Sequence, residues 1–415
     1  MRRVLLTGAT GNWGRATLRE LRERGDRIHV IALVMPTDRD REAIAEFADM
    51  ENLEVVWGDL TDAATVIACV QRVDIVLHVG AVVSPLADEQ PELAHRVNVG
   101  SMRNLIEAVR ALPAPASVAV VGIGSVAQTG SRNPPHHWGR VGDPVRVSRF
   151  DEYGQSKVTA ERLLVDSGLP KWVQRRQTGI LHPGMLEIRD PIMTHSPFGA
   201  VMEWVSAEDS ARLLANLCEP DVPDTVWGGI YNIGGGDGWR LTNWELQTAI
   251  GHAMGVRDIR RWYDRNWFAT GNFHGQWYTD SDRLEQVVPF RQDSFEAVLD
   301  RAMAAAPSCS IGRASARLDR EAPDHEATHP TAPRNDARHP NRQHPGDFSA
   351  FRLTRAVASD RDVVDVPSTL PVEASHTPGS RLRRVEAPSR MGPPRLPRSG
   401  DLPRRPPAEH RSGPR

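Results

Sequence analysis

Two side chains four positions apart, Tyr153 and Lys157, could exchange a proton with an alcohol or a ketone. The sequence predicts a helix over residues 151–166, and residues i and i+4 of a helix are neighbours on one face. A tyrosine has a free pKa near ~10 and is a poor base at neutral pH. A nearby ammonium group favours the phenolate and lowers that pKa, so we expect Tyr153 to act as a general acid or base.

Lysine is so rare in this chain that Lys157 stands out. Of 51 basic residues only Lys157 and Lys171 are lysine, and the other 49 are arginine. A compact ammonium group reaches its partners differently from a planar guanidinium, which gives a chemical reason for lysine here. With four tyrosines and two lysines in 415 residues, such a pair arises by chance with a probability of about 2 × 4/415, or ~0.02. We interpret Lys171 as a surface residue.

A glycine-rich turn at Thr7–Gly14 follows a short apolar run and opens a predicted helix. Glycines are needed where such a turn is tight and where backbone approaches a pyrophosphate, and the helix supplies free N–H groups. This context predicts a binding site for NAD or NADP, whose positive nicotinamide ring would lower the pKa of Tyr153 further. The residues expected to contact the cofactor here are Gly8, Thr10, Gly11, Asn12, Trp13 and Gly14.

Two further cofactor contacts stay undecided. Met35 and Pro36 occupy the expected ribose-contact positions after the second strand, and Asp38 and Arg39 follow slightly too late and with opposite charges. The choice between NAD and NADP therefore stays open. Asp59, after the third strand, is placed either to accept from the adenine amino group or to cap the next helix.

The elements that position these residues alternate between apolar runs and amphipathic segments. Such alternation, with β-branched apolar runs, predicts a Rossmann-type, doubly wound parallel α/β sheet. The expected strands are 4–6, 28–34, 53–57, 73–79, 118–123, 172–178 and 230–233. The first expected helix starts at the glycine turn. The other expected helices span 41–50, 62–71, 91–112, 151–166, 207–219, 242–254 and 294–305.

We expect three regions along the chain. Residues 1–182 form the dinucleotide-binding domain, with a strand near 229–236 returning to its sheet, and residues 183–306 form a small substrate-binding lobe. Residues 307–415 hold 17 of the 32 prolines, and their only aromatic residues are Phe348 and Phe351. Such a segment cannot bury enough apolar surface to offset the entropy of ordering it, so we expect a disordered tail rich in proline and arginine.

Composition excludes several classes of protein. The formal net charge of −2 argues against a nucleic-acid binder, and no apolar run approaches the ~18 residues of a membrane span. Three scattered cysteines indicate neither a zinc site nor a disulfide framework, and the histidines lack ligands at metal spacing, so we predict no metal. Without a signal peptide, the expected location is the cytoplasm.

The chain resembles the extended branch of the short-chain dehydrogenase/reductase superfamily, the NAD-dependent epimerase/dehydratase family. Motifs in the family's order cover residues 4 to about 290. Besides Thr7–Gly14 and Tyr153–Lys157 they are Gly58-Asp59-Leu60, His78–Ala81, Asn98–Ser101, Gly124-Ser125, Arg176 with His182-Pro183-Gly184, Val205–Ala211 and Tyr231–Gly236.

The resemblance implies a role for several of these residues. Ser125 would hydrogen-bond the substrate oxygen and orient it toward Tyr153, and Lys157 would hold the nicotinamide ribose. Asn98 would steady the central helix and a water of the proton relay. Asp59 and Leu60, with Gly80 and Ala81, would line the cofactor. The resemblance also implies a homodimer.

Departures from the family pattern narrow the chemistry. Val126-Ala127 stand after Ser125 where sugar dehydratases carry an acidic pair, which disfavours dehydration. The short stretch between Pro183 and Trp204 is largely apolar, so we expect a simpler pocket than the nucleotide-sugar members have, with a small-molecule substrate.

Three functions compete. The first is a dehydrogenase or reductase that interconverts a secondary alcohol and a ketone with Tyr153 as acid or base. The second is an epimerase, of nucleotide sugars or related compounds, that keeps its NAD bound and consumes none. The third is a non-catalytic dinucleotide sensor, which would not need Tyr153, Lys157 and Ser125 together.

Overall fold

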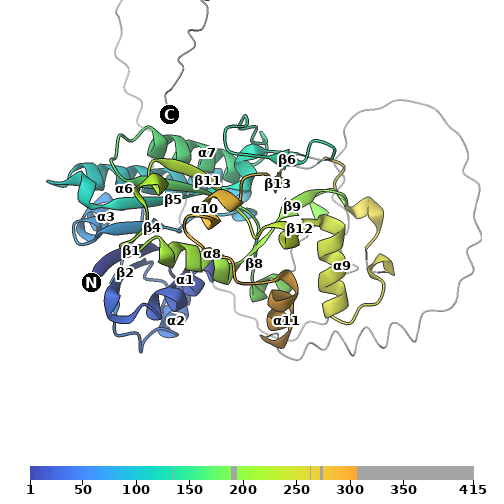
Figure 1. Ribbon diagram of the computed structural model, residues 1–415, viewed down its shortest axis with the longest axis horizontal. Coiled ribbons are helices and arrows are strands. Elements are labelled where there is room, and N and C mark those ends of the chain that lie inside the picture. Colours follow the sequence, from blue (N-terminus) through green and yellow to red (C-terminus); the bar gives the residue numbers. More distant parts are fainter. Residues whose placement is uncertain (133, 188–193, 262, 272–273, 306–415) are drawn as a thin grey trace, which may run out of the picture. The chain divides into compact units, whose positions relative to one another are not determined.

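The central feature of the fold is one parallel sheet of seven strands (Figure 1). The computed structural model describes residues 1–132, 134–187, 194–261, 263–271 and 274–305. Within them the strand order is β11-β7-β5-β4-β1-β2-β3, which confirms the doubly wound α/β class. The order reverses between β1 and β4, and ligands bind at such a switch point. The strands are β1 (Arg2–Thr7), β2 (Ile28–Val34), β3 (Leu53–Trp57), β4 (Ile75–His78), β5 (Ala119–Ser125), β7 (Trp172–Gln177) and β11 (Gly229–Ile233).

Helices cover both faces of this sheet. Figure 1 shows α1 (Asn12–Arg22), α2 (Asp38–Ala45) and α8 (Ala207–Asn216) on one side. On the other side are α3 (Ala63–Val70), α6 (Ser101–Arg110) and α7 (Glu152–Val165). Because both faces are covered, β4 and β5 are buried at every residue, which is why apolar residues dominate them up to His78 and Ser125 at their carboxyl ends.

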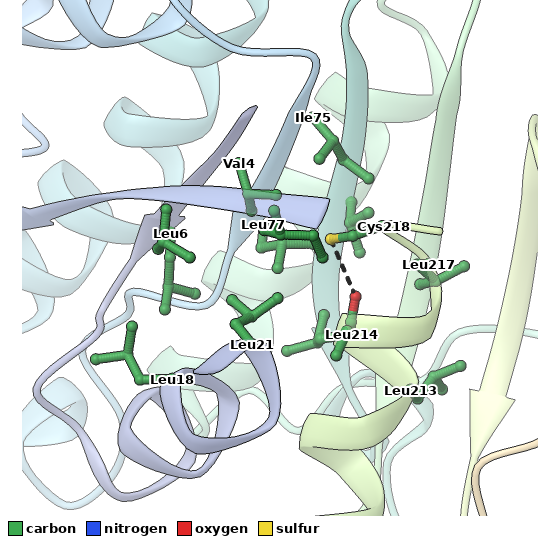
Figure 2. Close-up of a cluster of buried hydrophobic side chains, with 14 of the residues drawn as sticks. Val4, Leu6, Leu18, Leu21, Ile75, Leu77, Leu213, Leu214, Leu217 and Cys218 are labelled. Carbon is green, nitrogen blue, oxygen red and sulfur yellow. Dashed lines mark hydrogen bonds between the residues drawn. The ribbon is translucent and has the colours of Figure 1, made fainter. Parts of the chain in front are cut away.

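The packing on the first side is apolar throughout the close-up in Figure 2. Side chains from β1 and β4 meet those of α1 and of the α8 region, and burying each is worth ~1.5–3 kcal/mol. The Cys218 thiol also contacts the Leu214 carbonyl oxygen at 3.4 Å. The residues labelled there are Val4, Leu6, Leu18, Leu21, Ile75, Leu77, Leu213, Leu214, Leu217 and Cys218.

The segment beyond β7 supplies a second, smaller core. It is built around Leu181, Trp239, Leu246, Phe295 and Leu299. The short elements of the fold are α4 (Leu86–Glu89), α5 (Pro91–Ala94), β6 (Trp138–Gly139), β8 (Ile180–Leu181), β9 (Val201–Glu203), β10 (Val205–Ser206), β12 (Arg240–Thr242), β13 (Trp277–Tyr278) and α10 (Asp282–Glu285). The segment beyond β7 also contains two longer helices, α9 (Asn243–Ala253) and α11 (Phe295–Ala305).

Two predicted helices differ from the observed ones. The helix expected over 91–112 is split, because a π-helical turn at His95–Gly100 separates α5 from α6. The helix expected over 41–50 is α2, which begins at Asp38 because the Thr37 side chain caps it by accepting from the Asp40 N–H at 3.1 Å.

None of the helices in the described ranges has the length and apolar character needed to cross a membrane. The predicted disordered tail, 307–415, lies outside the described residues.

Candidate active site

A cleft of about 1190 Å³ opens at the carboxyl ends of the strands, where the sheet order reverses. Its walls come from the glycine turn, the ends of β4, β5 and β7, helix α7 and the lobe that follows β7. Of the predicted site residues it gathers Gly8, Thr10, Gly11, Asn12, Trp13, Gly14, Gly80, Ala81, Ser125, Tyr153 and Lys157. Asn98, Asp59 and Leu60 are not among its lining residues.

The glycine turn leaves room only for backbone. Gly8 has a φ of 70°, and a Cβ there would lie 2.6 Å from the Cα of Gly80. A Cβ on Gly14 would overlap the Gly8 carbonyl oxygen. Helix α1 begins after Gly11 with no side-chain cap and no acidic residue in its first turn. Its first N–H groups therefore face the cleft as a cradle for an anion, and the turn fits a dinucleotide diphosphate.

Buried hydrogen bonds tie the strand ends together beneath this turn. The Thr7 hydroxyl lies 3.0 Å from His78 Nδ1 and accepts from the Gly80 N–H at 3.0 Å. His78 Nε2 lies 3.1 Å from the Ser101 hydroxyl. Burial, with the charge of Lys157, lowers the pKa of His78 to about 3, so the ring is neutral and serves as a structural link between β1, β4 and α6.

The end of the cleft beside α2 differs from the sequence prediction. Neither Met35 nor Pro36 lines it, whereas Arg39 and Asp40 do. Thr10 Oγ1 donates to Asp40 Oδ1 at 2.6 Å, which holds this carboxylate against the glycine turn. Spacing from β2 alone missed Asp40, because the acid is brought back by the first turn of α2.

Asp59 does not cap α3, and its contact with the adenine amino group stays a prediction. Its Oδ1 accepts from the Thr61 N–H at 2.8 Å, and the cap of α3 is Asp62, which accepts from Ala64 and Thr65. Leu60 packs against Gly80, where a Cβ would lie 2.7 Å from Leu60 Cδ1.

Tyr153 and Lys157 lie on one face of α7, as their spacing predicts. Lys157 Nζ is 5.7 Å from the centre of the Tyr153 ring and donates to the Ile123 carbonyl oxygen at 3.0 Å. Helix α7 begins at Glu152 because Asp151 caps it, with Oδ1 accepting from the Gly154 N–H at 2.7 Å. The cap therefore sets where the phenol and the ammonium enter the cleft.

The expected lowering of the Tyr153 pKa is wrong for the protein by itself. Burial raises the pKa of Tyr153 to about 12; the Ser125 hydrogen bond lowers it and the Asp151 charge raises it. Burial also lowers the pKa of Lys157 to about 8, because a buried ammonium loses its hydration. The ammonium hydrogen-bonds the end of β5, so the phenolate is not stabilised by it in the way the spacing suggested.

Ser125 is the last residue of β5 and lines the cleft. It caps a short 3₁₀ turn at Val126–Thr129, where its Oγ accepts from the Ala127 N–H at 3.2 Å, and its hydroxyl hydrogen-bonds Tyr153. The glycine before it has a packing reason. A Cβ on Gly124 would collide with the amide of Gln128, whose Oε1 accepts from the Ser125 N–H at 2.7 Å.

Asn98 lies outside the cleft and braces its wall. From the π-helical turn it accepts from the Val82 N–H and donates to the Val82 carbonyl oxygen, both at 2.8 Å. It also donates to the Ser156 hydroxyl at 2.9 Å, next to Lys157 on α7. These contacts make Asn98 a positioning residue between α7 and the segment after β4.

Two histidines for which the sequence predicted no role as metal ligands line the cleft. They are His182 and His274. His274 Nδ1 is 3.5 Å from Oδ2 of Asp151, the buried cap of α7. No local sequence pattern predicts the contact between His274 and Asp151, because the two residues lie far apart in the chain and only the fold brings them together.

The comparisons with known proteins agree with this geometry. A model of the NAD dependent epimerase/dehydratase family matches residues 4–169. D-erythronate dehydrogenase of Cupriavidus necator is 30% identical over 237 residues, which cover 54% of this chain and 67% of that protein. Methionine adenosyltransferase 2 subunit beta of Xenopus tropicalis is 26% identical over 271 residues, 61% of this chain and 73% of the relative.

The chain therefore belongs to the NAD dependent epimerase/dehydratase family, as its motifs indicate. It is an NAD-dependent enzyme of the short-chain dehydrogenase/reductase type.

Solved structures show the same fold. The dTDP-glucose 4,6-dehydratase of Streptomyces venezuelae, solved with NAD, has a TM-score of 0.58 at 23% identity and covers 73% of this chain and 96% of its own. The UDP-glucose 4-epimerase of Thermus thermophilus, also with NAD, has a TM-score of 0.57 at 20% identity and covers 74% and 100%.

Proposed function

We propose that the protein is a dehydrogenase or reductase that interconverts a secondary alcohol and a ketone, with Tyr153 as general acid or base. The observation that carries this proposal is the meeting of three groups in one cleft below a glycine turn. Tyr153 and Lys157 share a face of α7, and the Ser125 hydroxyl hydrogen-bonds the phenol. A non-catalytic binding protein needs no such arrangement.

Each group has a distinct task in this mechanism. The Ser125 hydroxyl orients the substrate oxygen, and Tyr153 takes a proton from the alcohol or gives one to the ketone. Lys157, anchored at Ile123 near the end of β5, would hold the nicotinamide ribose. The glycine turn would hold a dinucleotide whose nicotinamide, when bound, would supply the hydride chemistry.

The cofactor preference that we propose is NAD over NADP. Asp40, held by Thr10, puts a carboxylate at the end of the cleft beside α2. A carboxylate pairs with ribose hydroxyls and repels an added phosphate. Arg39 also lines this end, so we expect NADP to bind more weakly than NAD without being excluded.

The substrate that we propose is small and lacks a diphosphate. The cleft wall contributed by the lobe is largely apolar and includes Met185, Val201, Met202 and Trp204. Among the described lining residues, the basic side chains beyond His182 and His274 are Arg15, Arg39 and Lys157, which belong to the cofactor half. A nucleotide-sugar diphosphate would find no arginine partner in that described wall.

A cofactor and substrate panel tests the proposal. We expect net oxidation of NADH, faster than of NADPH, with at least one small ketone, and a loss of about 10²–10⁴-fold in kcat/KM for Tyr153→Phe. Lys171→Arg, far from the proton transfer, is the matched control and should keep full activity. A Tyr153→Phe enzyme as active as the wild type would sink the mechanism.

The same assay separates the other candidates. An epimerase, suggested by the family's scope, would invert its substrate without changing the NADH concentration. The remaining candidate is a non-catalytic dinucleotide-binding role. That role predicts NADH binding without turnover of any substrate. Cytoplasmic location, a homodimer and the domain boundary at residue 182 stay predictions from the sequence.

A further inference from the structure

Arg175, on β7, is a fully buried cation without an acidic partner. Its side chain has no exposed surface, and among the residues that the structure describes no carboxylate lies within ion-pair distance of it. The adjacent Arg176 gives the contrast, because it is also buried but is held by both carboxylate oxygens of Glu161 at 2.9 and 2.6 Å.

The contacts of Arg175 point toward the cofactor side of the cleft. Its guanidinium carbon lies 5.3 Å from the centre of the Trp13 ring, and Trp13 belongs to the first turn of α1. One Nη reaches Gln177 Oε1 at 3.3 Å and the Ser210 carbonyl oxygen at 3.4 Å. Trp13 and Gln177 both line the cleft. Nε and the other Nη have no hydrogen-bond partner among the described atoms.

This arrangement is costly for folding alone. A buried charge without a partner destabilises a protein, and an apolar side chain of similar volume is usually as good or better. Burial lowers the pKa of Arg175 to about 9, so the side chain still carries its charge at neutral pH. Position 175 lies among apolar residues such as Val173 and Ile233, where leucine or methionine would pack.

We propose that Arg175 is a buried positive charge that stabilises the diphosphate of the bound dinucleotide from beneath the glycine turn. Arg175 is a positioning residue, because it acts through Trp13 and the start of α1 without lining the cleft itself. In the interior the charge is screened less than at the surface, so it is felt by an anion on the N–H groups of α1. It adds to the positive end of the helix, whose first turn carries no acidic side chain.

The test compares ligands that differ in charge. Dissociation constants for NADH, ADP and adenosine are measured by titration calorimetry on the full chain, with melting temperatures alongside. For Arg175→Met we expect NADH and ADP to bind about tenfold more weakly, adenosine to change less than about twofold, and the melting temperature to hold or rise. Arg175→Lys, which keeps the charge, should restore most of the affinity.

Two controls make the outcome decisive. Arg110→Met removes an arginine that donates only to the Ser167 carbonyl oxygen on the other side of the sheet, and it should leave all three affinities unchanged. Arg175→Gln serves if the methionine variant does not fold.

Unchanged NADH and ADP binding in the neutral variants would overturn the proposal. An equal loss for adenosine would overturn it too, because that would indicate altered packing under Trp13. The proposal rests on the dinucleotide site and not on turnover. A wild type that binds NADH without catalysis would therefore refute the proposed function alone.

Discussion

The pKa of Tyr153 is shifted in opposite directions by its surroundings, and residue spacing alone does not reveal these shifts. The spacing of Tyr153 to Lys157 was sufficient to predict that the two side chains share a face of α7. The pKa could not be predicted in the same way, because it depends on burial and on Ser125 and Asp151. Burial and the partner of Lys157, the Ile123 carbonyl, are properties of the folded chain.

The Asp151 carboxylate should therefore tune the pH dependence of the reaction. Its charge raises the pKa of Tyr153, so removing that charge lowers it. Alcohol oxidation needs the phenolate, and its kcat/KM rises with pH through that pKa. For Asp151→Asn we expect the acidic limb of the kcat/KM profile to move to lower pH, while the amide oxygen still caps Gly154.

The matched control is Asp88→Asn. Asp88 Oδ1 accepts from the Glu152 N–H at 3.0 Å, so it also bonds the head of α7, but it contributes nothing to the pKa of Tyr153. Its profile should coincide with that of the wild type. A limb that stays in place or moves to higher pH in Asp151→Asn would refute the electrostatic role of Asp151.

At the scale of elements, local sequence predicted the strands of the central sheet better than the helix ends, and it missed the short strands of the small sheets. Strands such as β2 are runs of apolar residues buried on both faces, so their limits follow directly from composition. Helix ends depend on caps such as Thr37, and the π-helical turn at His95–Gly100 has no local sequence signal. That turn matters for the site because it carries Asn98 to Val82 and Ser156.

The joint between α7 and β7 is a buried ion pair whose strength can be measured. Glu161 and Arg176 make two parallel hydrogen bonds, and both side chains are less than a tenth exposed. Glu161→Ala would leave Arg176 as an uncompensated buried charge, and we expect it to lower the free energy of unfolding by about 3–5 kcal/mol in urea titrations.

A double variant separates charge from packing at this joint. Glu161→Leu combined with Arg176→Met replaces the pair by apolar groups, and such replacements are often neutral or stabilising. We expect it to recover most of the loss. A cost below about 1 kcal/mol for Glu161→Ala would contradict the buried-pair account, because that is the range of exposed pairs.

At the scale of the whole molecule, the alternation of strands and helices was enough to predict the parallel sheet. The way the later segments complete the cleft was not predictable, since His274 and the lobe wall reach it through tertiary packing. Asp40 shows the same limit near the start of the chain, because its approach to Thr10 depends on how α2 folds back on the glycine turn.

The last core-forming element of the described chain is α11, and this fixes where the chain can be shortened. Phe295, Val298 and Leu299 of α11 belong to the lobe core, and Ala302 is 2% exposed. The composition of residues 307–415 predicts that they build no core of their own. We expect a chain of residues 1–306 to keep the full-length melting temperature within a few degrees and the same kcat/KM.

A chain that ends at residue 294 provides the contrast. It removes Phe295, Val298 and Leu299 from the lobe core, and each lost side chain is worth ~1.5–3 kcal/mol of burial. Its melting temperature should fall steeply, and its activity with it, because Trp204 of the cleft wall packs on that same core. A 1–306 chain that unfolds, or melts as early as the 1–294 chain, would show that residues 307–415 stabilise the enzyme.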